Sequence, residues 1–153
     1  MTEQEEHYVH FAMCITWLND SWGLLHAIED QPNNPLRWAA FRFALIEYSK
    51  PYKLSHGSTK NFKLDTSLIP TELLPLHERI INSRDQVHAH SDITVMEAKL
   101  HVHESMGERY TLISQNRITG VEELPNLKKV IELIEATLDS MYEKEKILQA
   151  GLP

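Results

Sequence analysis

The chain has one cysteine, five glycines and no long hydrophobic run among its 153 residues. The single cysteine, Cys14, excludes an intramolecular disulfide and gives no sign of an oxidising compartment. It lies in a helical apolar pattern, so we expect it to be buried as a small hydrophobe. No apolar segment approaches the roughly 18 residues that cross a bilayer, so we expect no membrane association.

Glycines are too scattered to form a loop that cradles phosphates. Gly57, Gly107 and Gly120 stand alone, which argues against hydrolysis of nucleoside triphosphates. We expect no cofactor. The first six residues are acidic and lack the basic-then-apolar layout of a secretory signal. We therefore expect a cytoplasmic protein.

Charge is unevenly balanced, with 15 basic and 22 acidic residues and a net charge of -7. A general attraction to nucleic acid is therefore not expected, although a local basic cleft is compatible with this balance. Four lysines, Lys50, Lys53, Lys60 and Lys63, fall in or beside the polar connection 52–69. They form either a local basic rim or an ordinary solvated loop.

Apolar residues recur at three- and four-residue steps over the first fifty residues, which predicts two helices. Thr2 is the expected N-cap of the first, with Glu5 as its capping-box partner, and this helix ends near residue 30. The second begins with Asn34 as its cap and Pro35 at its first position, and Pro51 ends it. Its two apolar stripes predict burial on most sides. They comprise Trp38, Phe41, Leu45 and Tyr48, and Leu36, Ala40, Phe43 and Ile46.

The second half of the chain predicts two more helices around a β-hairpin. A third helix opens at Pro70–Thr71, and a last one spans roughly 124–149. Between them, alternating residues on either side of Met106-Gly107 predict a hairpin within 97–117. Two sets of apolar residues form the core stripes of these helices. They are Leu73, Leu76, Ile80 and Val87 with Arg84 on the same face, and Leu127, Ile131, Ile134, Leu138, Met141 and Ile147.

The predicted fold is therefore a single domain over 1–153, all-α in class. It is an antiparallel helical bundle of about four main helices, with a small β-hairpin inserted before the last helix.

The segment 84–92 concentrates unusual chemistry at the end of the third helical pattern. It reads Arg-Asp-Gln-Val-His-Ala-His-Ser-Asp. Arg84 is a permanent cation suited to a phosphate, and His88 and His90 can exchange protons near neutrality. Together they could hold a phosphodiester and move its protons. The plainer interpretation is a surface pair of Arg84 and Asp85 beside two solvated histidines.

Helix geometry limits how these residues can meet. Arg84 and His88 are four apart and share a helix face, whereas His90 is about 240° around from Arg84. Arg84 and His90 therefore converge only if the helix ends near residue 89 or a second subunit completes the site.

The string from Ile81 to Asp92 resembles the signature of HEPN domains (higher eukaryotes and prokaryotes nucleotide-binding). That signature is an arginine, a polar residue, a short spacer and a histidine, here Arg84, Asp85, four residues and His90. His88 departs from it, because relatives tend to carry an apolar residue there. The resemblance implies a helical homodimer, and in many members a metal-independent ribonuclease of toxin–antitoxin or defence systems. It implies Arg84 and His90 as the catalytic pair, Asp85 as the polar partner, and an antitoxin as a possible partner.

In such a ribonuclease, His90 would take the proton of a ribose 2′-hydroxyl and Arg84 would stabilise the phosphoryl oxygens. A second His90, or His88, would protonate the leaving oxygen. DNA, which has no 2′-hydroxyl, is not an expected substrate.

Two other functions fit the same residues. His88, His90, His101 and His103 form two close pairs that could converge on zinc or copper. The chain could also be a non-catalytic helical dimerisation, RNA-binding or protein-binding module. In that case, Arg84 and Asp85 pair within one subunit and no cleft forms around His90.

Overall fold

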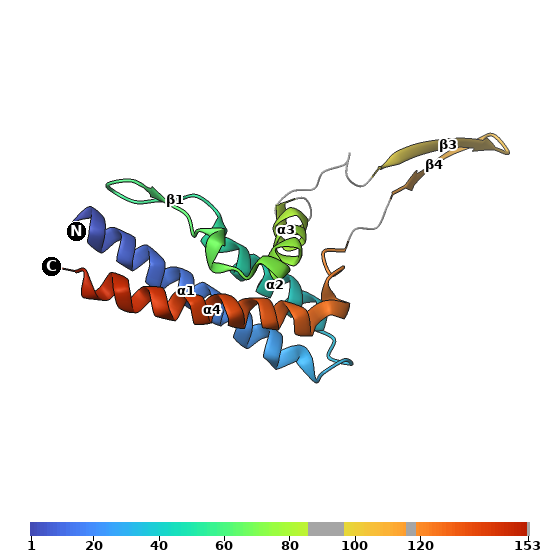
Figure 1. Ribbon diagram of the computed structural model, residues 1–153. Coiled ribbons are helices and arrows are strands. Elements are labelled where there is room, and N and C mark those ends of the chain that lie inside the picture. Colours follow the sequence, from blue (N-terminus) through green and yellow to red (C-terminus); the bar gives the residue numbers. More distant parts are fainter. Residues whose placement is uncertain (86–96, 116–118, 153) are drawn as a thin grey trace.

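The computed structural model describes residues 1–85, 97–115 and 119–152. These residues form a mostly helical structure with four α-helices and two small antiparallel hairpins (Figure 1). The helices are α1 (Glu3–Glu29), α2 (Arg37–Ser49), α3 (Leu74–Ser83) and α4 (Leu127–Ala150). The strands are β1 (Ser55–His56), β2 (Asn61–Phe62), β3 (Lys99–Ser105) and β4 (Glu108–Ser114). No helix within 1–85 or 119–152 combines the length and apolar character that crossing a membrane requires.

The predicted start of α1 is confirmed. The Thr2 hydroxyl accepts from the Glu5 amide, and the Glu5 carboxylate accepts from the Thr2 amide. This reciprocal capping box satisfies two amides that a helix N-terminus otherwise leaves without partners. The helix ends at Glu29, as its apolar pattern predicts.

The two longest helices, α1 and α4, lie antiparallel, so the two chain ends lie at the same end of the helices (Figure 1). Side-chain hydrogen bonds join them in opposite chain order. Gln4 donates to the Gly151 carbonyl, Asn19 to the Tyr142 hydroxyl, and Trp22 to the Glu135 carboxylate. The long α1 is thus held against α4 over most of its length.

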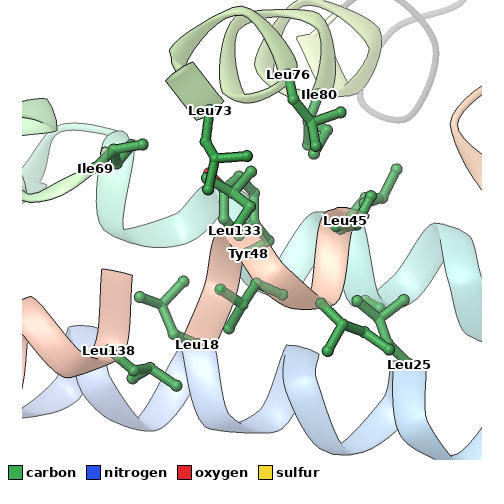
Figure 2. Packing of buried hydrophobic residues seen from close by; sticks show 14 of the residues in the cluster. Leu18, Leu25, Leu45, Tyr48, Ile69, Leu73, Leu76, Ile80, Leu133 and Leu138 are labelled. Atoms are coloured by element: carbon green, nitrogen blue, oxygen red, sulfur yellow. The ribbon is translucent and has the colours of Figure 1, made fainter. Parts of the chain in front are cut away.

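The core lies where α1, α2, α3 and α4 face one another (Figure 2). It is built from aliphatic side chains together with the aromatic rings of Phe11, Phe41, Tyr48 and Tyr52. Cys14 is fully buried within it, as predicted. Its buried helical members include Leu18, Leu25, Leu45, Leu76, Ile80, Val130, Leu133, Ile134 and Met141.

The helix α2 begins later than predicted. Its N-cap is Leu36, and Pro35 lies in the preceding turn. The Asn34 side chain still accepts a backbone amide, that of Leu36, but it closes a turn ahead of the helix. The predicted cap therefore has the right chemistry and the wrong position.

The prediction that α2 is buried on most sides is wrong. Phe41, Leu45 and Tyr48 are buried, whereas Leu36 is 68% exposed and Phe43 is 51% exposed. Trp38 is also exposed. Two apolar stripes bury a helix only when neighbours cover both, and in the described structure α2 packs mainly on α1 through one of them.

Segment 52–69 is more ordered than the predicted polar connection. The short β1–β2 hairpin turns at Gly57, and four of the segment's side chains join the buried interior. They are Tyr52, Phe62, Leu64 and Ile69. The basic-rim alternative for the four lysines is weakened, because Lys50 pairs with Glu47, Lys53 with Asp85, and Lys60 with Glu3.

The third and last helices broadly follow the predicted pattern. A short 3-10 helix, Thr71–Leu73, precedes α3, and α4 begins at Leu127. Ile147 is a correction: it is 73% exposed, because the neighbouring Leu148, seven residues after Met141, continues the stripe that packs against the core. Val87 lies outside the described residues.

The predicted hairpin is confirmed. Strands β3 and β4 pair in register from Lys99↔Ser114 to Ser105↔Glu108. Met106 and Gly107 form the turn and both have positive φ, a conformation suited to tight hairpins. Every residue of both strands is exposed, and Figure 1 shows the hairpin projecting away from the helices.

Candidate functional site

Arg84 and Asp85 lie at the end of α3, where the Arg84 amide donates to the carbonyls of Ile80 and Ile81. The Asp85 carboxylate accepts from two cations. Arg84 Nη1 lies 3.1 Å from one oxygen, and Lys53 Nζ lies 2.5 Å from the other. We call Lys53, Arg84 and Asp85 the end cluster.

The electrostatics of the end cluster favour an ionised carboxylate with surplus positive charge. Partial burial raises the pKa of Asp85, but hydrogen bonds and charge from Lys53 and Arg84 outweigh it and leave the pKa below its usual value. Two cations and one anion make the cluster net positive on a chain of net charge -7. All three side chains remain partly accessible, so a phosphate could exchange with the Asp85 carboxylate.

The structure brings together only part of the predicted site. Arg84 and Asp85 pair within one chain, as the non-catalytic interpretation predicts. His88 and His90 lie outside the described residues, so the prediction that they converge with Arg84 stays a prediction. Lys53 was missed as a site residue, because its approach to Asp85 joins positions 32 residues apart in sequence.

Of the four histidines proposed as metal ligands, the structure describes His101 and His103, and both contact other side chains of the β3–β4 hairpin. His101 and His103 lie on the same face of β3, but His101 Nε2 is 2.8 Å from the Ser114 hydroxyl and His103 stacks on Tyr110. Within residues 1–85, 97–115 and 119–152, no three His, Cys, Asp or Glu side chains gather as a metal site. His88 and His90, the other half, lie outside these ranges.

The sequence analysis did not predict a buried polar pair, Tyr48 and His77, between α2 and α3. The Tyr48 hydroxyl lies 2.7 Å from His77 Nδ1, and Tyr52 packs against the same imidazole. Burial lowers the pKa of His77 to about 4, so its ring is neutral at physiological pH. All three residues are buried, which gives them a structural role. His77 lies at helical spacing with the apolar Leu73 and Ile80, and this spacing could have predicted that its ring is buried.

A second polar cluster anchors the β1–β2 hairpin to α1. The Glu6 carboxylate accepts from the amides of Ser58 and Thr59 and from the Thr59 hydroxyl, and these bonds lower the pKa of Glu6 to about 2. Beside it lies a cavity of about 380 Å³ lined by residues of α1 and the hairpin, including His10 and Phe62.

Burial raises the pKa of Cys14 to about 12, so this thiol is not a nucleophile.

No protein-family model, curated protein or solved structure matches this chain.

Proposed function

We propose that this chain is a HEPN-like, metal-independent endoribonuclease that acts in the cytoplasm as a homodimer. The observation that carries the proposal is the end cluster, in which Arg84 and Lys53 share the carboxylate of Asp85. This net-positive group stands immediately before the segment that contains His88 and His90. The proposal includes a bundle arrangement of the helices, which the antiparallel packing of α1 and α4 supports.

The proposed reaction needs only side chains of this chain. His90 accepts the proton of a ribose 2′-hydroxyl, and the resulting oxygen attacks the adjacent phosphorus. Arg84, assisted by Lys53, stabilises the charge that grows on the phosphoryl oxygens. A second His90, or His88, protonates the departing 5′-oxygen. The products are a 2′,3′-cyclic phosphate and a 5′-hydroxyl, and DNA is not cleaved.

A role in a toxin–antitoxin or defence system follows from the same proposal. The partner would be an antitoxin protein that holds the ribonuclease inactive.

Cleavage of mixed-sequence RNA in excess chelator tests the proposal. We expect activity in the wild type and losses of about 100-fold or more in Arg84→Ala and His90→Ala. Arg79→Ala is the matched control, because this α3 arginine is exposed and pairs with Glu123. Activity lost in chelator would instead support the histidine metal site.

A second candidate is a non-catalytic dimerisation or binding module, favoured by the Arg84–Asp85 pair within one chain. In that case, a well-folded wild-type dimer cleaves none of several RNAs. Arg84→Ala then changes stability alone.

A further inference from the structure

The β3–β4 hairpin presents an aliphatic surface to solvent. Because directly paired residues share a face of a two-stranded sheet, the pairs Leu100↔Ile113 and Val102↔Thr111 lie on the same side. We call these four residues the aliphatic face. Leu100 is 65% exposed and Ile113 is 69% exposed.

Polar and aromatic side chains of the opposite face of the hairpin contact one another. His103 stacks on Tyr110 at 5.5 Å, and His101 is held by the Ser114 hydroxyl. The two faces therefore differ: the opposite face carries His101, His103 and Tyr110 beside a single aliphatic residue, Leu112, whereas three aliphatic side chains gather on the aliphatic face.

A free two-stranded hairpin is marginally stable in water, and apolar faces of this kind are normally packed against another element. Figure 1 shows this hairpin extending away from the helices of its own chain. Its charges balance, with Lys99 and Arg109 against Glu104 and Glu108. A second copy of this acidic chain is therefore not repelled by the hairpin, whereas two helical bodies repel each other.

A complementary apolar surface exists on α2. Leu36, Ala39, Ala40 and Phe43 follow one another at positions i, i+3, i+4 and i+7, and so form one stripe. Leu36 and Phe43 at its two ends are both mostly exposed. We call these four residues the α2 stripe.

Interface area decides how two copies can use these surfaces. Seven-residue strands give each hairpin face roughly 240 Å². Two hairpins face to face would bury only about 480 Å², well below the roughly 1,000 Å² of a specific interface. Two reciprocal contacts between a hairpin and a helix would bury about 960 Å², which is twice that area and close to the lower limit of a specific interface.

We propose that two copies of this chain exchange hairpins, so that the aliphatic face of each lies on the α2 stripe of the other. The exchange is two-fold symmetric, so every contact occurs twice. The inference rests on the proposed function only in that both require a homodimer. The tests of the interface need no RNA.

Solution mass of the full chain tests the interface. We expect a dimer of twice 17.7 kDa by light scattering. The double variant Leu100→Thr/Ile113→Thr keeps strand propensity, and Phe43→Gln keeps a helix former; both should shift the mass to the monomer. Matched controls remain dimeric: Leu112→Thr, from the opposite face and 56% exposed, and Ile147→Gln on α4.

Engineered cysteines test the pairing itself, because the natural Cys14 is buried. Under mild oxidation, the double variant Val102→Cys/Ala39→Cys should form a covalent dimer, and each single variant should not. A crosslink in Val102→Cys alone would mean that the hairpins face each other, which overturns the exchange. A monomeric wild type, or a dimer unaffected by the aliphatic-face and Phe43 variants, also overturns it. RNA cleavage with either of these results would leave the proposed chemistry standing and remove only this interface.

Discussion

At the scale of single residues, the buried Tyr48–His77 pair ties stability to pH. The folded state holds His77 with a pKa of about 4, against an ordinary value of 6.5. The unfolded chain therefore binds a proton first as the pH falls. The stability that comes from keeping His77 neutral is full above about pH 6.5 and is lost as the pH falls toward 4.

We expect the free energy of unfolding to fall by on the order of 3 kcal/mol between these limits because of His77. Urea unfolding across this pH range measures the loss. The fall should shrink in His77→Gln and persist in His56→Gln, whose ring is exposed in the β1–β2 hairpin. An equal fall in all three proteins would assign the pH dependence to other groups. If His77→Gln does not fold, Tyr48→Phe tests the pair through its lost hydrogen bond, at about 1–3 kcal/mol at neutral pH.

Residue types identified the chemistry of the end cluster but not its geometry. Arg84 and Asp85 stand out in sequence because a helix end rarely places such groups together. Lys53 looked like one of four loop lysines, and only tertiary packing brings it to Asp85. Likewise, His77 falls on the buried side of α3 because α2 supplies Tyr48 as its partner, and a single sequence does not reveal that partner.

At the scale of elements, two glycines should respond oppositely to the same substitution. A Cβ on Gly57 would lie 2.7 Å from the Lys60 carbonyl oxygen and 2.9 Å from the Glu6 carboxylate. Both neighbours are fixed by hydrogen bonds, so Gly57→Ala should displace the β1–β2 hairpin from α1. A Cβ on Gly23, within α1, meets nothing within 4 Å.

We therefore expect Gly23→Ala to raise the free energy of unfolding by about 0.5–1 kcal/mol, through helix propensity. Gly57→Ala should lower it by about 1–3 kcal/mol, as overpacking does. Chemical denaturation of both variants beside the wild type measures the two signs. Stabilisation by Gly57→Ala would show that the loop yields easily and that Glu6 does not anchor it.

Elements with strong local signals were predicted well. The capping box of α1 and the alternation of β3 and β4 are local features, and both are confirmed. The β1–β2 hairpin was missed because two-residue strands have no period to detect, and a carboxylate from α1 holds its loop. The exposure of Leu36 and Phe43 was missed because periodicity shows that a stripe is apolar but not that a neighbour covers it.

At the scale of the whole molecule, the acidic charge restricts how RNA could bind. With net charge -7, attraction has to come from a local group such as the end cluster. Binding of single-stranded RNA releases about 0.7 counterion for each phosphate neutralised. If Arg84 and Lys53 neutralise two phosphates, the logarithm of the association constant should fall with the logarithm of salt concentration with a slope of about -1.4.

Fluorescence anisotropy with labelled RNA measures this slope, with His90→Ala used to prevent cleavage. In that background, Lys53→Ala should make the slope shallower by about 0.7, because one phosphate contact is lost. Lys128→Ala, an exposed lysine on α4, should leave it unchanged. A slope steeper than about -4 would require more than five phosphate contacts, and therefore a broad basic surface. The end cluster supplies only two cations, Lys53 and Arg84, so such a slope would require RNA to contact cations outside this cluster.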